Sequence, residues 1–505
     1  MVKQLDRVMV LVAAIFFACA ARVSSEHVDV LLPGAAQPRS LDAAALQAWY
    51  GDKLDLKKDA QLTKDIQRAE ALVTNLLLTA DSSKRLTLKQ ELIALKLPPL
   101  ALRAVMRYGQ IPSWKDLKKG EFNVTVTVPT PGFKDMPVNV TLLVPKNYTQ
   151  EKRWPVILSL HGAHGNGGEY AQHWLQGSGV EQIKDFIVVA PTAIEGYGWG
   201  PSTYGRAQVS AALNFVASAF RTDPERVYIE GCSMGGVGTK RLAAFWPDRF
   251  AAMVTRAGPP IPPQQAAVLR NLHALPWLSF AGAQDEKIAE KYFIAEKELA
   301  TKEKLPATME IFPDRGHESF EDKDKDVLNF FASNTIQRAP DRLRFVSFED
   351  GGGQRHHYAE ITATDTFADS PSDEIVLNNS KIDEPLLKQM QTAATLSQYE
   401  AFLKQAKEKG LVLESKKIWS KGRELDLHVD RVANAIVIDR TAFVKQARFY
   451  VDDDVVDMDK EIVVRIQDRI LLKKKVERSI PVLIDELLKS GRRDVTYWGS
   501  LDVRL

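Results

Sequence analysis

A serine between two glycines in the middle of the chain has the spacing of a catalytic nucleophile. Gly231, Ser233 and Gly235 form the pattern Gly-x-Ser-x-Gly within the segment 229–236. An apolar stretch precedes the serine and helix-permitting residues follow it, which is the strand–turn–helix context of a nucleophile elbow. The backbone of such a turn is strained, so small residues on either side must let the chain pass itself closely. The pattern therefore predicts an activated serine at Ser233.

A serine hydroxyl is a weak nucleophile, so it needs a base to remove its proton and an acid to orient that base. His317 is the candidate base, because it directly follows an apolar run at 308–312, late in the chain. Asp285 is the candidate acid, because it follows the apolar run 277–280. Its neighbour Glu286 is the alternative acid. The three residue types together predict a Ser–His–Asp triad.

An acyl-transfer reaction also needs two hydrogen-bond donors for the oxyanion that develops on the substrate. The backbone N–H of Met234, next to the nucleophile, is one candidate. The backbone N–H of Ala163 is the other, because it lies in a glycine-rich loop at 161–168 that allows close backbone approach. This loop lacks the Gly-Lys-Ser ending of a phosphate-binding loop. The residues that we expect to line the substrate pocket are His161, Gly162, Tyr197 and Trp199.

The segments that carry these residues alternate between short apolar runs and helical patterns. Strands that are apolar on both faces and alternate with helices indicate a parallel sheet covered on both sides. We therefore predict an α/β fold, with a doubly wound, mostly parallel sheet, for residues 121–337. A hairpin at 122–128 and 138–144 precedes it. The predicted strands are 156–160, 186–190, 227–229, 251–255, 277–280 and 309–312, and the predicted helices are 207–220, 238–244 and 287–300.

This middle third of the chain resembles the α/β-hydrolases, specifically the branch of polyhydroxybutyrate depolymerases, feruloyl esterases and prolyl-oligopeptidase-like enzymes. The resemblance implies the α/β-hydrolase fold and its chain order of nucleophile, acid and histidine, which this sequence follows. It covers residues 121–337. The motifs that carry it are Leu160-His161-Gly162, Gly231-Cys232-Ser233-Met234-Gly235-Gly236, Ala281-Gly282-Ala283-Gln284-Asp285 and Gly316-His317.

Two regions flank the predicted catalytic domain. Residues 21–120 form a helical N-terminal region, because leucines recur at helical spacing between residues 41 and 108. We expect these helices to pack against the catalytic domain or to cover it in part. Residues 338–505 are strand-rich, with one helical stretch at 384–407, and are interpreted as a β-rich accessory domain.

The first 20 residues have the pattern of a signal peptide. Lys3 and Arg7 precede an unbroken apolar run at 8–19, and Ala18-Cys19-Ala20 resembles a cleavage site. The run is shorter than the roughly 20 residues of a membrane-spanning helix. We therefore predict a secreted or periplasmic protein with no stable membrane span after cleavage. An uncleaved N-terminal anchor is the alternative.

Composition excludes several classes of function. The chain has 505 residues, a formal net charge of +2 and two cysteines, so a strong field for nucleic acid and a disulfide framework are both absent. No metal site is expected. The acidic run at 452–459 lacks the glycine and spacing of a calcium loop and is interpreted as a solvated turn, and adjacent His356 and His357 would face opposite ways on a strand. The oligomeric state cannot be inferred.

Three functions are consistent with these residues. The leading hypothesis is a carboxylic-ester hydrolase that forms an acyl-enzyme on Ser233, with no cofactor, and acts on a small-molecule or polymer-linked ester such as an acylated polysaccharide. The first alternative is a serine peptidase of the prolyl-oligopeptidase type. The N-terminal region is short and helical, whereas such peptidases usually carry a large β-propeller there. The second alternative is a non-catalytic carbohydrate- or partner-binding protein on a hydrolase scaffold, which would have no reason to keep a complete triad.

Overall fold

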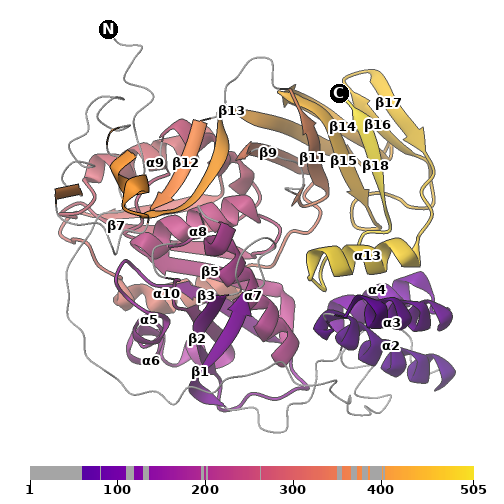
Figure 1. Cartoon of the computed structure of the whole chain (residues 1–505), viewed down its shortest axis with the longest axis horizontal. Helices are drawn as coiled ribbons and strands as arrows, with labels where there is room; N and C mark the ends of the chain where they lie inside the picture. Colours follow the sequence, from indigo (N-terminus) through magenta and orange to yellow (C-terminus); the bar gives the residue numbers. More distant parts are fainter. Residues whose placement is uncertain are drawn as a thin grey trace.

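The computed structural model contains two β-rich bodies and a group of helices (Figure 1). It describes residues 60–79, 81–109, 119–128, 136–194, 198–200, 203–261, 263–349, 355–365, 372–377, 385–386, 401 and 404–505. The predicted signal peptide and most of the helical stretch predicted at 384–407 lie outside the described residues. Within the described part of the chain, no helix is long and apolar enough to span a membrane.

The larger body is built on one eight-stranded sheet with the strand order β1-β2-β4-β3-β5-β6-β7-β8. The first two strands pair antiparallel, β2 pairs antiparallel with β4, and the remaining neighbours are parallel. This confirms the predicted large, mostly parallel sheet. The strands are β1 (Gly120–Val128), β2 (Met136–Val144), β3 (Trp154–Leu160), β4 (Ile187–Pro191), β5 (Thr222–Cys232), β6 (Ala252–Arg256), β7 (Trp277–Gly282) and β8 (Ala307–Phe312).

Helices cover both faces of this sheet. Every residue of β3, β4, β6 and β7 is buried, which is why their sequences are mostly apolar and do not alternate with exposed polar residues. Helices α7, α8 and α9 contribute to the apolar core on one face, and α5, α6 and α10 to the core on the other. The helices are α5 (Gly167–Ala171), α6 (His173–Gln176), α7 (Thr203–Ala219), α8 (Met234–Phe245), α9 (Glu290–Lys302) and α10 (Asp324–Ala332), with 3₁₀ segments η3 (Gln182–Asp185), η4 (Pro263–Leu272) and η5 (Glu321–Lys323).

The smaller body contains two sheets formed by the C-terminal part of the chain. One has the order β10-β11-β15-β18, and the other has the order β12-β13-β14-β16-β17, with β9 also pairing with β13. The chain passes between the sheets at Phe443, which separates β14 from β15 and has a positive φ of 58°. The elements are β9 (Arg342–Glu349), β10 (Arg355–His356), β11 (Ala359–Thr364), β12 (Ser372–Leu377), β13 (Val412–Asp430), β14 (Ala435–Ala442), β15 (Val444–Val451), β16 (Ile462–Ile466), β17 (Arg469–Lys474), α13 (Ile480–Ser490) and β18 (Gly499–Arg504).

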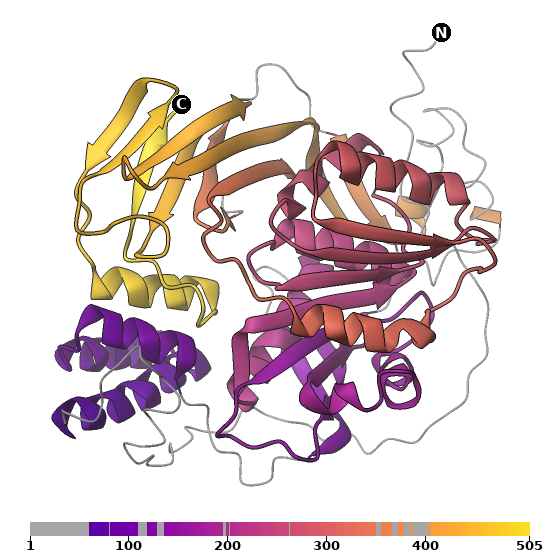
Figure 2. The same cartoon turned by 180° about the vertical axis from the view of Figure 1, so that it is seen from behind.

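The N-terminal helices pack mainly on this smaller body. Helices α2 (Ala60–Leu78), α3 (Ser82–Ala94) and α4 (Pro99–Tyr108) lie beside α13 in both views (Figures 1 and 2). Their buried side chains, such as Val105, share one apolar cluster with Leu483 and Trp498 of the C-terminal region. The end of α4 also contacts the catalytic domain, where Tyr108 donates to Glu225 at 2.6 Å and Arg221 donates to the carbonyl of Gly109 at 2.6 Å, so the expected packing on that domain is limited to this end. We call α2–α4 and the described residues from 342 onward the accessory unit.

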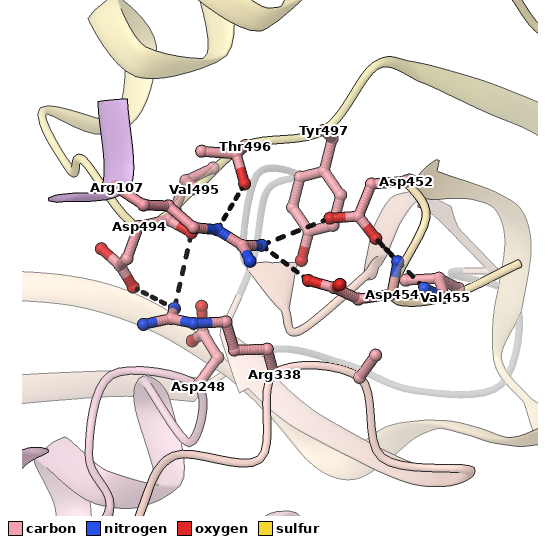
Figure 3. Close-up of a pocket in the computed structure, with 11 residues that line it drawn as sticks. Arg107, Asp248, Arg338, Asp452, Asp454, Val455, Asp494, Val495, Thr496 and Tyr497 are labelled. Atoms are coloured by element: carbon pink, nitrogen blue, oxygen red, sulfur yellow. Dashed lines mark hydrogen bonds and ion pairs between the residues drawn. The ribbon is translucent and has the colours of Figure 1, made fainter. Parts of the chain in front are cut away.

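Charged side chains hold parts of the accessory unit together and attach it to the segment between α10 and β9 (Figure 3). Arg107 of α4 donates to Asp454 at 2.8 Å, and Arg338 donates to Asp494 at 3.0 Å. Asp452 is only 2% exposed and pairs with Arg103 of α4 at 2.7 Å. The acidic run at 452–459 is therefore not the fully solvated turn that its composition suggested, because arginines distant in sequence neutralise it. A run of aspartates in the sequence does not indicate which distant arginines will pair with it.

Candidate active site

Ser233 occupies the turn between β5 and α8 with a strained backbone, φ 55° and ψ −115°. Its N–H donates to the carbonyl of Arg256 on the neighbouring strand at 2.8 Å. A Cβ on Gly235 would lie 1.9 Å from the carbonyl oxygen of Leu160, and one on Gly231 would lie 2.5 Å from the backbone of Gly235. The two glycines are thus required by close backbone approach, as the sequence pattern predicted for a nucleophile elbow.

His317 lies between Ser233 and Asp285 and contacts both. Its Nε2 is 2.9 Å from Ser233 Oγ, and its Nδ1 is 2.8 Å from Asp285 Oδ2. The Asp285 side chain is completely buried, and its other carboxylate oxygen accepts the N–H groups of Lys287 and Ile288 at 2.8 Å each. Because the carboxylate is fixed by these two donors, it can hold the imidazole with Nδ1–H toward Asp285 and a lone pair toward the serine.

Glu286, the alternative acid, occupies a different position. Its side chain is exposed, whereas Asp285 is buried. Hydrogen bonds from its own N–H and from the N–H of His317 lower the pKa of Glu286. The structure therefore brings Asp285, and not Glu286, to the histidine ring.

The loop that carries His317 is held from its outer side by Arg315. This guanidinium donates to both carboxylate oxygens of Glu318 at 2.8 Å and to Asp322 at 2.7 and 3.0 Å. It also lies 4.3 Å above the ring of Phe320. On the inner side, a Cβ on Gly282 of β7 would lie 2.1 Å from the carbonyl of Arg315, so the loop packs directly on the strand that leads to Asp285.

Met234, one of the two predicted oxyanion donors, directly follows the serine, and the residue before the other, Ala163, lies close to it. Met234 is the first residue of α8, where backbone N–H groups have no carbonyl of the preceding turn to bond. Gly162, which precedes Ala163, is close enough that its Cβ would lie 3.5 Å from that of Ser233. Ala163 itself is exposed in a turn closed by the hydrogen bond from Gly165 N–H to the carbonyl of Gly162 at 3.3 Å.

The residues predicted to line the pocket fall into two groups. His161 and Trp199 are 3% and 2% exposed, and Trp199 donates to the carbonyl of His161 at 2.9 Å. The His161 Nδ1–H donates to the Gly162 carbonyl at 2.6 Å, and its Nε2 accepts the N–H of Ala193 at 3.0 Å. Burial lowers the pKa of His161 to about 4, so the ring is neutral near pH 7. These two side chains brace the loop 161–168 from beneath, and Tyr197 lies outside the described residues.

Sequence reasoning missed a buried polar network beneath the triad. Arg256, the last residue of β6, donates to Asp324 Oδ1 at 2.6 Å, and its Nε lies 3.4 Å from Glu230 Oε2. All three side chains are completely buried. Tyr170 donates to Glu230 Oε2 at 2.8 Å, and Ser159 donates to Glu230 Oε1. The one available signal was the presence of Glu230 and Arg256 directly after the apolar runs predicted as strands at 227–229 and 251–255.

Comparison with known proteins agrees with this geometry. Residues 134–359 match the model of a family described as "Putative esterase". The chain is 36% identical over 144 residues to "Putative esterase NocK" of Nocardia uniformis subsp. tsuyamanensis, covering 26% of this chain and 40% of that protein. It is 31% identical over 139 residues to "Feruloyl esterase B" of Thermothelomyces thermophilus, covering 25% and 46%. It is also 31% identical over 143 residues to "Acetylxylan esterase A" of Aspergillus oryzae, covering 25% and 45%.

The matched part of the chain spans less than half the length of each of these relatives. The family match lies over seven of the eight strands of the central sheet and over Ser233, Asp285 and His317. Residues 134–359 are therefore a segment of the esterase family within the α/β-hydrolases, as the motifs around these three residues indicated.

Proposed function

We propose that this protein is a serine carboxylesterase that acts through an acyl-enzyme on Ser233. The observation that carries the proposal is the continuous chain of contacts from Ser233 Oγ to His317 and from His317 to the buried Asp285, at 2.9 and 2.8 Å. A serine, a histidine and a carboxylate in this order are the minimum needed to activate a hydroxyl near neutral pH.

The proposed reaction has two halves. Ser233 Oγ attacks the ester carbonyl while His317 Nε2 takes its proton, and Asp285 stabilises the imidazolium that forms. The oxyanion accepts the N–H groups of Met234 and Ala163. The intermediate collapses when His317 returns the proton to the leaving alcohol oxygen. Water then attacks the acyl group with His317 as base again, and the acid leaves as Ser233 regains its proton.

The proposed substrate is an ester of a small acid with a sugar or polysaccharide. Support comes from the names of the relatives, a feruloyl esterase and an acetylxylan esterase, which concern those proteins. The predicted signal at residues 1–20 adds the proposal that the enzyme is exported, where polymer-linked esters are accessible. Nothing in the mechanism needs a metal or an organic cofactor.

The two alternatives receive less support. A peptidase of the prolyl-oligopeptidase type would need an additional substrate-gating domain, and the described N-terminal segment forms three helices. A carbohydrate-binding function commonly uses exposed aromatic rings. In the part of residues 342–505 whose side chains the structure describes, the aromatic rings are buried, apart from the half-buried Phe443.

The experiment compares the purified protein with Ser233→Ala and with Ser333→Ala, a matched control on the exposed end of α10. Each is treated with a fluorophosphonate probe and with p-nitrophenyl acetate. We expect labelling and turnover in the parent and in Ser333→Ala, and neither in Ser233→Ala. Turnover of acetyl and feruloyl esters above that of prolyl peptides would support the esterase over the peptidase. Absence of labelling in a folded parent would refute the proposal.

A further inference from the structure

Arg256 links the two loops that carry the nucleophile and the base. Its main-chain carbonyl accepts the N–H of Ser233 at 2.8 Å. Its guanidinium Nη1 donates to the carbonyl of Ser319 at 2.8 Å, and the carbonyl of Phe320 lies 3.4 Å away. Ser319 is two residues beyond His317, so one residue fixes both ends of the hydrogen bond between Ser233 and His317.

The guanidinium is itself fixed by buried carboxylates. Asp324 at the start of α10 and Glu230 at the end of β5 lie on two sides of it, and burial alone would lower the pKa of Arg256, but these negative charges raise it. The ring of Trp174 lies 5.3 Å from its central carbon. Burying charged side chains costs desolvation free energy, so a buried ion pair stabilises a fold less well than apolar side chains of similar size. Their presence directly under the triad therefore calls for a role other than stability.

The conformation of the histidine loop gives a second indication. Phe320 has a left-handed backbone, φ 52° and ψ 46°, which is unfavourable for an aromatic residue. The carbonyl of Ser319 immediately before it points to the Arg256 guanidinium. The bond from Arg256 thus offsets local strain in the segment that follows His317, and the loop needs this bond to keep its present course.

We infer that Arg256 is a positioning residue that holds His317 in line with Ser233. This inference rests on the proposed function, since it assigns a role in the same triad. A guanidinium suits the role because Nη1 donates to both Asp324 and the Ser319 carbonyl, while Nε, on another side of the same rigid plane, lies 3.4 Å from Glu230. A lysine at this position can keep the ion pair with Asp324, but its single nitrogen cannot lie beside Asp324 and the Ser319 carbonyl and also face Glu230.

The test uses Arg256→Lys, Glu230→Gln and a control, Arg492→Met. Arg492 is also a buried arginine, paired with Asp248 at 2.9 Å, but it lies in the accessory unit away from the triad. Turnover of p-nitrophenyl acetate, the rate of fluorophosphonate labelling and the melting temperature are measured for each. We expect Arg256→Lys to lower kcat and the labelling rate by about 100-fold, the effect of misplacing a reacting group by roughly 1 Å. KM should change by no more than about threefold, since binding contacts remain.

The control separates positioning from stability. Arg492→Met should lower the melting temperature but keep kcat within about threefold of the parent. The inference is overturned if Arg256→Lys keeps kcat and the labelling rate of the parent, or if both variants lose activity only in proportion to their loss of folded protein. If Arg256→Lys does not fold, Glu230→Gln, which keeps the size of the side chain, must show the same selective loss of kcat.

A second readout is independent of turnover. The hydrogen bond from His317 Nδ1–H to Asp285 should give a strongly deshielded proton NMR resonance, assigned by its absence from Asp285→Ala. We expect this resonance to shift or broaden in Arg256→Lys and to remain in Arg492→Met. An unchanged resonance in Arg256→Lys refutes the inference. A parent without any turnover or labelling refutes the proposed esterase instead, and the NMR comparison still tests Arg256.

Discussion

Replacing Gly235 by alanine would place a methyl group 1.9 Å from the carbonyl oxygen of Leu160. The added methyl group is attached to the main chain at Gly235 and meets main-chain atoms, so the clash cannot be relieved by rotating a side chain. To reach 3.0 Å, the shortest separation that real Cβ atoms show, α8 must move away from β3 by about 1 Å. Ser233 immediately precedes α8 and would move with it, so its 2.9 Å contact with His317 would lengthen to about 4 Å, beyond hydrogen-bond range.

This displacement determines the expected magnitude. A shift of about 1 Å in a catalytic group costs on the order of 100-fold in rate, or about 2.7 kcal/mol of transition-state stabilisation. Overpacking should also cost about 1–3 kcal/mol of folding free energy, although alanine is favoured over glycine in a helix by about 1 kcal/mol. We therefore expect kcat/KM for p-nitrophenyl acetate to fall by about 100-fold and the melting temperature to fall by a few degrees.

The matched control is Gly168→Ala near the start of α5, where the added Cβ would meet only the side chain of Asn166 at 3.3 Å and that of Thr141 at 3.4 Å. Those side chains can adjust, so its kcat/KM should stay within about threefold of the parent. Assays of both variants beside the parent, with melting curves, decide the matter. Equal activity of Gly235→Ala and Gly168→Ala would refute the argument that close backbone approach positions the nucleophile.

Three further predictions concern the acid, the accessory unit and pH. Asp285→Asn should lower kcat about 10⁴-fold, because the amide favours the wrong tautomer of His317. Glu286→Gln should change kcat by no more than about threefold. Equal losses of kcat in a p-nitrophenyl acetate assay would contradict the assignment of Asp285 as the acid. Arg103→Met should cost about 1.5–3 kcal/mol in urea unfolding, because it removes the nearer of the two arginines that pair with the buried Asp452 and leaves Arg107 at 3.6 Å. Lys89→Met, at an exposed pair, should cost under about 1 kcal/mol, and similar losses would argue against a buried ion pair. Burial lowers the pKa of His357 to about 4, so as the pH falls the unfolded chain binds this proton before the folded chain does. The free energy of unfolding should therefore have its full value above about pH 6.5 and fall by about 3 kcal/mol as the pH approaches 4. Urea midpoints that fall equally in His357→Gln and the parent would contradict this.

The arrangement of the central sheet followed from local features of the sequence. Runs such as 156–160 and 277–280 are apolar except for one serine each and do not alternate with charged residues, as expected of strands buried on both faces. The glycines around Ser233 indicated the nucleophile elbow for a different reason, because the close backbone approach at a sharp turn permits few residue types other than glycine. Since the carboxyl ends of parallel strands share one edge, loops after three of these strands bring Ser233, Asp285 and His317 together.

The placement of the N-terminal helices could not be predicted in the same way. The apolar face of α2, which includes Leu72 and Leu76, indicates that the helix is covered but not which surface covers it. The partners, among them Trp498, follow hundreds of residues later in the sequence. The charged side chain of Arg256 gave as little information about Asp324, because a pair 68 residues apart leaves no local pattern.

The shared core of the accessory unit also has a consequence for biosynthesis. Helices α2–α4 are made before the strands of the central sheet, yet α13, which packs on α3 and α4, begins only at Ile480. At about 5–20 residues per second, the interval between Tyr108 and Ile480 lasts on the order of 20 to 75 s. During this time the central sheet can fold as a unit, while the apolar side chains of Val105 and its neighbours remain exposed to solvent. A nascent chain of this kind offers a chaperone a defined apolar target until its last strand, β18, is complete.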